Sequence, residues 1–102
     1  MAEDNGGILS PIEDKKLSVV REFLRREFRN FTHDDFYDRE KRAQVFVLQA
    51  STKSRHMLVV PKDTFEHDDF VYLLTVQVAD ALQQAGDVPL ILTPEGPHLS
   101  LR

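Results

Sequence analysis

The chain has 102 residues, of which 41% are hydrophobic and 29% charged, and a formal net charge of −4 at pH 7. This length predicts one small domain with a hydrophobic core. The absence of cysteine excludes disulfides, thiolate metal sites and cysteine nucleophiles. No apolar run approaches the roughly 20 residues that span a bilayer. The acidic N-terminal sequence MAEDNGG lacks the basic and apolar regions of a secretory signal, so we expect a cytoplasmic protein.

The N-terminal part predicts a disordered start over residues 1–9, followed by a single α+β domain over 10–102. A helix is expected over residues 11–30, with Ser10 as its cap, Pro11 in its first turn and Glu13 completing a capping box. Its buried stripe follows at helical spacing and consists of Leu17, Val20, Leu24, Phe28 and Phe31.

The middle of the chain predicts an antiparallel hairpin. Residues 32–42 form a charged segment without a clear period, which we expect to be a connector. Two Val-rich runs, 43–50 and 55–61, flank a polar turn over 51–54 and predict the paired strands. Both runs are continuously apolar at their centres rather than alternating, and such strands are usually covered on both faces.

Residues 65–85 favour a helix over about 68–85, with Gly86 placed to end it in a left-handed conformation. The apolar residues share one helical face, although the composition of 70–78 also suits a strand. The run is too long for a typical strand, and this length favours the helix.

The C-terminal part predicts two more strands, over 88–93 and 98–102, separated by a turn at 94–97. Pro89 lacks a donor N–H, so its strand should lie at an edge or begin there. The resulting order is α-β-β-α-β-β, a two-layer α+β sandwich with a mainly antiparallel sheet packed by two helices.

Charge is unevenly distributed, because residues 39–62 carry six basic residues against one acid, and residues 63–102 carry seven acids against Arg102 alone. A basic helix face and hairpin tip could bind nucleic-acid phosphates, and this is the alternative function. The candidate residues for it are Arg21, Arg25, Arg29, Arg39, Lys41, Arg42, Lys53 and Arg55. Surface ion pairing along the helix explains the same residues and is the favoured interpretation.

The sequence F-x-H-D-D-F occurs twice, beginning at Phe31 and at Phe65. A divalent metal bound through His33, Asp34, His67 and Asp68 is a third hypothesis, which requires both copies to meet. Helix capping by the aspartates accounts for both copies without a metal and is favoured.

No motif of catalytic chemistry is present. The four histidines are scattered, and the sequence holds no nucleophile elbow, phosphate-binding loop or dinucleotide fingerprint. His56, in an apolar strand, is best interpreted as a structural histidine. We therefore expect a protein without enzymatic activity and without a cofactor.

The remaining signal is an excess of apolar residues, because two helices cannot easily cover both faces of the apolar strands. This favours a protein-interaction module, with a homodimer expected. The predicted interface residues are Phe70, Val71, Leu73, Val76 and Pro89. The alternative is that the same residues form an ordinary monomer core.

Overall fold

The structure is a computed structural model that describes residues 10–50 and 54–100, leaving residues 1–9, 51–53 and 101–102 outside the description. Its elements in chain order are α1 (Asp14–Glu27), β1 (Thr32–Asp38), β2 (Ala43–Gln49), β3 (Arg55–Pro61), α2 (Lys62–Phe65), α3 (Phe70–Leu73), the π-helical segment η2 (Leu74–Val78), α4 (Ala79–Ala85), β4 (Leu90–Thr93) and β5 (Gly96–Leu99).

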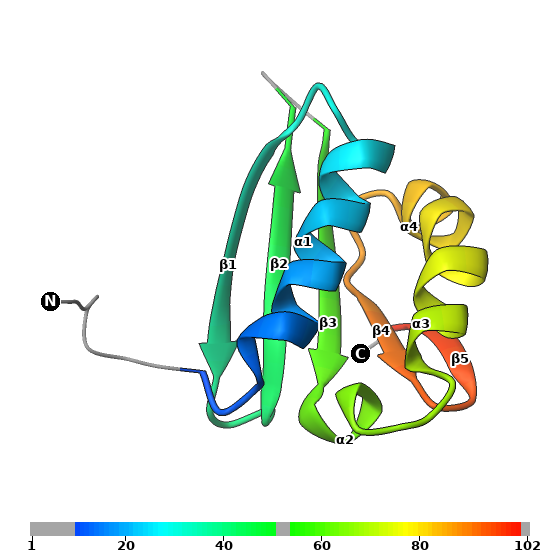
Figure 1. Cartoon of the computed structure of the whole chain (residues 1–102). Helices are drawn as coiled ribbons and strands as arrows, with labels where there is room; N and C mark the ends of the chain where they lie inside the picture. Colours follow the sequence, from blue (N-terminus) through cyan, green and yellow to red (C-terminus); the bar gives the residue numbers. More distant parts are fainter. Residues whose placement is uncertain (1–9, 51–53, 101–102) are drawn as a thin grey trace, which may run out of the picture.

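The five strands form one sheet in the order β1-β2-β3-β4-β5, antiparallel except where β3 and β4 run parallel. The helix between β3 and β4 supplies the crossover that a parallel pair requires. α1 and the α3–α4 helix lie on the same face of the sheet, so the molecule has two layers (Figure 1). The predicted α+β sandwich is confirmed, with one more strand ahead of the second helical region than predicted.

That additional strand is β1, so the prediction of a connector over residues 32–42 was wrong. Its residues alternate in exposure, with Thr32, Asp34 and Phe36 exposed and the intervening side chains partly buried. Strand periodicity was hidden because the partly buried positions are His33, Asp35 and Tyr37 rather than aliphatic residues.

α1 buries the predicted stripe, with Leu17, Val20, Leu24 and Phe28 in the core and Phe31 packed against it. The helix begins at Asp14, and the predicted Ser10 cap is not formed. Ser10 Oγ instead accepts a hydrogen bond from the Ile12 N–H at 3.1 Å. Serine closes such local turns as readily as it caps helices, which explains the error.

The second helical region is continuous from Phe70 to Ala85, confirming the helix favoured by the sequence. Its middle turn is π-helical, which inserts one extra residue and turns the second half by about 100° relative to a regular helix. Two apolar stripes that are offset in sequence therefore face the core together. Gly86 ends the helix with a φ of +59°, a conformation that favours glycine.

The predicted hairpin strands are confirmed as β2 and β3, while its turn at 51–54 lies almost entirely outside the described residues. β4 begins directly after Pro89, and β4 and β5 are joined by a tight turn at Pro94 and Glu95. β4 itself lies between β3 and β5, so the sheet edges are β1 and β5. Within the described residues, no helix is long and apolar enough to cross a membrane.

Candidate functional site

The two faces of the sheet differ in what covers them. On the helix side, Phe46, Leu48, Leu58 and Val60 are buried in the main core beneath α1 and the α3–α4 helix. Their neighbours along the same strands point to the opposite side. Because successive side chains alternate, the continuously apolar centres of β2 and β3 supply apolar residues to both faces.

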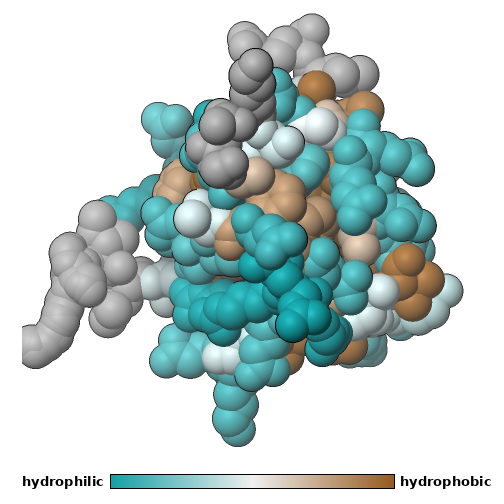
Figure 2. Space-filling model, turned by 90° about the horizontal axis from the view of Figure 1, so that it is seen from above, coloured by the Kyte–Doolittle hydropathy of each residue, from teal (hydrophilic) through white to brown (hydrophobic). Residues whose placement is uncertain are grey.

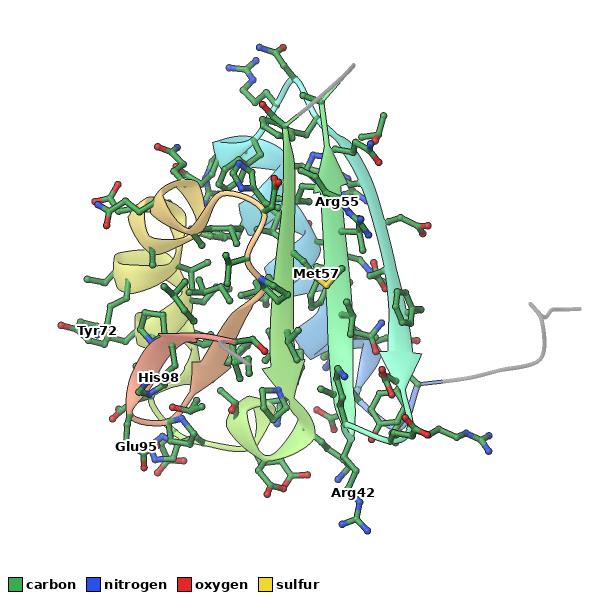
Figure 3. The ribbon with its side chains drawn as sticks, turned by 180° about the vertical axis from the view of Figure 1, so that it is seen from behind. Arg42, Arg55, Met57, Tyr72, Glu95 and His98 are labelled. Atoms are coloured by element: carbon green, nitrogen blue, oxygen red, sulfur yellow. The ribbon has the colours of Figure 1, made fainter. Side chains whose placement is uncertain are left out.

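The face opposite the helices, called the open face below, carries a second apolar cluster. Across the sheet, Phe36, Val45, Val59 and Ile91 stand in one row, and Val47 and Met57 stand beside each other in the next. Figure 3 views this face directly and shows Met57 near its middle with no helix in front of it. None of the helices and strands that the structure describes covers the cluster.

Exposure within the open face is graded. Ala43, Val45 and Val59 are buried, with Val47, Met57 and Ile91 packed around them and partly exposed. Phe36 at the β1 edge is 51% exposed. The expectation that β2 and β3 are covered on both faces is therefore met throughout the helix side, and on the open face only at Ala43, Val45 and Val59.

Polar residues of both charge signs border the open face. Asp34 lies beside Val47 at the β1 edge, and the next row runs from Thr32 through Gln49 to Arg55. Both Asp34 and Arg55 are exposed, and neither enters an ion pair with any other described residue.

The five predicted interface residues divide between core and surface. Phe70 and Leu73 are 4% and 5% exposed and belong to the main core, so their assignment to an exposed interface was wrong. Val71 and Val76 are 52% and 59% exposed, as an interface requires. The π-helical turn is the reason, because a regular helix from Val71 would have placed that residue with Leu74 and Val78 in the core. Pro89 is partly buried.

The candidate phosphate-binding residues do not form one surface. The register places Arg55 at one end of the sheet and Arg42 at the other, as Figure 3 shows. Strands of seven residues separate these ends by about 20 Å. Arg25 and Arg29 lie toward the Arg55 end, at the close of α1, because the Phe28 ring contacts the His56 ring there.

The remaining candidates follow the same division. Arg39 and Lys41 lie in the β1–β2 turn with Arg42, and Lys53 is outside the described residues. Figure 2 looks down on the Arg55 end of the molecule, where hydrophilic side chains cover much of the view and hydrophobic ones lie among them. In the described part of the chain, the basic residues of the alternative nucleic-acid hypothesis therefore lie at two opposite ends of the sheet rather than on one continuous surface.

Arg21 is engaged within the fold. Its Nε and Nη2 donate to the two carboxylate oxygens of Asp35 at 2.9 and 2.7 Å. The hydrogen bonds from this guanidinium to Asp35 raise the pKa of Arg21 above its ordinary value. Gln44, which is buried, donates from Nε2 to the same carboxylate at 2.7 Å, while its Oε1 has no partner in the described structure.

A cavity of about 210 Å³ lies beside this ion pair, between α1 and β1. Arg25, His33 and Asp35 contribute to its polar wall, and Phe46 and Leu48 form an apolar floor. The Nε2 of His33 lies 2.9 Å from the Phe28 carbonyl, which accepts a hydrogen bond from it. The cavity therefore combines charges of both signs that are partly committed to contacts within the fold.

The two His-Asp-Asp segments do not meet. His33 and Asp34 open β1 at the Arg55 end, whereas His67 and Asp68 lie in the turn between α2 and α3 at the other end. No group of three or more His, Asp or Glu side chains suited to a metal ion occurs among the residues described. The segments also differ in structure, since one is a strand and the other a turn.

His56 is a structural histidine, as its sequence context indicated. It is buried, and its Nδ1 donates to the carbonyl of Gly86 at 3.1 Å. The rings of Phe28 and Phe31 pack against it with centroid distances of 5.6 and 5.4 Å.

Sequence reasoning missed Phe36 as a surface residue because β1 was not recognised. The available signal was the pair of aromatic residues Phe36 and Tyr37 within a segment of seven residues, which suits a strand. Val47, Met57 and Ile91 were within predicted strands, but their common face could be named only once the strand order was known.

Comparison of the chain with models of known protein families, with curated proteins and with solved structures gives no significant match.

Proposed function

We propose that this chain is a small non-catalytic interaction module that pairs with a second copy of itself through the open face. The observation that carries the proposal is the row Phe36–Val45–Val59–Ile91 with Met57 beside it, an apolar cluster beyond the reach of the helix layer. Packing two such faces together removes apolar surface from water and resembles the packing of paired sheets in sandwich folds.

The size of the face sets the expected strength of the contact. With strands about 4.8 Å apart and about 3.3 Å of rise per residue, the open face covers about 450 Å² per copy. Two copies would bury about 900 Å², which is below the roughly 1,200 Å² at which standard specific interfaces begin and is typical of weak, transient contacts. We therefore expect weak, reversible association rather than a permanent dimer.

The charges that border the face favour a second copy over a strongly charged partner. Asp34 on β1 and Arg55 on β3 have opposite signs and are separated by the strand between them. In a two-fold contact, residue i of one copy meets residue j of the other and the reverse also holds. Asp34 of each copy can therefore face Arg55 of its partner.

Sedimentation equilibrium from about 5 to 500 μM tests this proposal. The unmodified chain should shift from monomer toward dimer across that range. Phe36→Asp should remain monomeric, because it places a charge in the contact, while the matched control Val76→Asp on the helix surface should dimerise like the unmodified chain. A monomer throughout, or equal loss in both variants, contradicts the proposal.

A charge exchange tests the arrangement of the two copies. Asp34→Lys and Arg55→Glu should each weaken dimerisation, because each places like charges opposite one another. The double variant should recover most of the loss. Additive losses in the double variant would show that the two residues do not face each other.

A further inference from the structure

Met57 places a sulfur atom in the open face. The chain has no cysteine and two methionines, Met1 and Met57, of which Met1 lies outside the described residues. Met57 lies on β3, directly across from Val47 on β2 and two residues before Val59. A contact made through the open face therefore has to bury the thioether of Met57.

The side chain of Met57 is partly exposed, because it has an in-register neighbour on one side alone. β4 pairs with β3 at Leu58 and Val59, so the pairing ends one residue short of Met57. None of the described helices lies over this face, and Figure 3 shows the sulfur atom of Met57 near its middle. In a single copy of the chain, small molecules in the solvent can therefore reach this side chain.

From this position we infer that Met57 is an oxidation site, through which a peroxide weakens the pairing of two copies. The inference rests on the proposed function, because it concerns the same face. In the reaction with hydrogen peroxide, the O–O bond breaks, an S–O bond forms and the second peroxide oxygen leaves as water. The sulfur loses two electrons, and the product is methionine sulfoxide.

The sulfoxide changes what Met57 contributes to the contact. The thioether is apolar and flexible, whereas the sulfoxide oxygen is polar and accepts hydrogen bonds. The nearest open-face neighbours, Val47 and Val59, carry no side-chain donor. Burying this oxygen between two apolar clusters is therefore unfavourable, and a two-fold contact contains two such oxygens. A single copy keeps its fold, because there the oxygen faces water.

The oxidation of Met57 is reversible by enzymes. Methionine sulfoxide reductases return the thioether, and the oxygen leaves as water while two thiols become a disulfide. The chain has no cysteine, so both thiols come from the reducing system. Pairing through the open face would therefore fall when peroxide rises and recover after reduction.

Sedimentation equilibrium before and after peroxide treatment tests the inference. The full chain is treated with hydrogen peroxide at about 5 μM protein, the peroxide is removed, and mass spectrometry of the peptide that contains Met57 verifies the gain of one oxygen. The treated chain should dimerise about tenfold or more weakly than the untreated chain, because two polar groups are buried. Circular dichroism should show both samples folded.

Two substitutions assign the effect to Met57. Met57→Gln places a polar group at this position, so it should weaken dimerisation without any peroxide. Met57→Leu keeps an apolar side chain of similar volume without sulfur, so its own dimerisation constant should be the same before and after treatment. This variant retains Met1 and therefore also controls for oxidation at that residue.

The rate of oxidation provides a second readout. A thioether buried between two copies meets peroxide only after the copies separate. With peroxide in large excess, Met57 of the unmodified chain should therefore be oxidised more slowly at about 500 μM protein than at about 5 μM. In Phe36→Asp, which should remain monomeric, the rate should be the same at both concentrations.

The outcomes separate this inference from the proposed function. An untreated chain that is monomeric throughout contradicts both. Where the untreated chain dimerises, the inference alone is overturned if Met57 gains no oxygen at about 5 μM protein, if its oxidation leaves dimerisation unchanged, or if Met57→Leu loses dimerisation equally on treatment. Full dimerisation of Met57→Gln, or an oxidation rate of the unmodified chain that does not depend on protein concentration, also overturns it.

Discussion

The helix-side face and the open face of the sheet are built from the same strands but differ in their cover. Phe46 on the helix side is buried in the main core, whereas Phe36 on the open face is half exposed. The two phenylalanines lie on neighbouring, paired strands, β1 and β2. Hydrophobicity therefore determines which side chains are stabilised by burial. The path of the chain determines which of them the chain itself buries.

The largest expected effect comes from truncating a phenylalanine on each face. Phe46→Ala should destabilise the fold by about 3–5 kcal/mol, because it leaves a cavity in the core. Phe36→Ala should cost less than about 1 kcal/mol at low micromolar concentration, because that side chain already contacts water. Urea denaturation of both variants measures the difference, and equal losses would refute the distinction between the faces.

The next-largest effect concerns two neighbouring aspartates that point to opposite faces of the sheet. Asp35 points toward the helix side and accepts from Arg21 and Gln44, whereas Asp34 points to the open face and is exposed. Asp35→Ala should cost about 1–3 kcal/mol, because it leaves the buried Gln44 amide without its acceptor. Asp34→Ala, the matched control at low concentration, should stay within about 0.5 kcal/mol.

The Asp35 prediction is checked by urea denaturation, with Arg21→Ala and the double variant completing a thermodynamic cycle. The double variant should cost less than the sum of the single changes, since Arg21 and Asp35 contact each other. Additive losses would show that the ion pair contributes nothing to stability.

The π-helical turn separates the core side of the second helix from its exposed side, which carries Val71 and Val76. Deleting Thr75 removes the extra residue and moves the later part of the helix back by one position. Phe70, Leu74 and the buried apolar residues after η2 should then share one face of a regular helix. We expect a folded protein within about 1 kcal/mol of the unmodified chain. Inserting one alanine at the same point should destabilise it more.

Circular dichroism and urea denaturation compare the deletion with the insertion. If the deletion unfolds the chain while the insertion is tolerated, the explanation that η2 aligns the two apolar stripes with the core is wrong.

The smallest expected effect is the pH dependence of an exposed pair at the end of the sheet. Lys62 Nζ donates to Glu66 Oε2 at 2.7 Å, which lowers the pKa of Glu66 below its ordinary 4.5 and raises that of Lys62 above 10.5. The contribution of Glu66 to stability is present above pH 4.5 and is lost as the pH falls through its lowered pKa. That of Lys62 is present below pH 10.5 and is lost as the pH rises through its raised pKa.

Comparing the unmodified chain with Glu66→Gln measures this effect. The difference in unfolding free energy should be constant from pH 6 to 9 and should shrink below pH 4.5. A difference that grows as the pH falls would contradict the assigned direction of the pKa shift.

Local patterns predicted most of the fold. The stripe of α1, the strands β2 and β3, and the helix ending at Gly86 follow from apolar spacing and from the conformational freedom of glycine. β1 escaped prediction because its inward positions are His33, Asp35 and Tyr37 rather than aliphatic residues. The polar atoms of His33 and Asp35 find their partners only in the folded chain.

The candidate surfaces were harder to predict than the elements. Phe70 and Leu73 were assigned to an interface because a π-helical turn leaves no clear mark in the sequence, and its phase shift exchanges core and surface positions. The open face depends on strand order, which joins Phe36 to Val59 and Ile91 through β2. Local sequence does not specify that order.

The most direct test of the central claim is an isotope-filtered NMR experiment on a sample in which half of the molecules are labelled, at about 500 μM. The account predicts intermolecular contacts between the Met57 methyl group or the Phe36 ring of one copy and open-face side chains of the other. Intermolecular contacts confined to Val71, Tyr72 and Val76, or none at all, would contradict it.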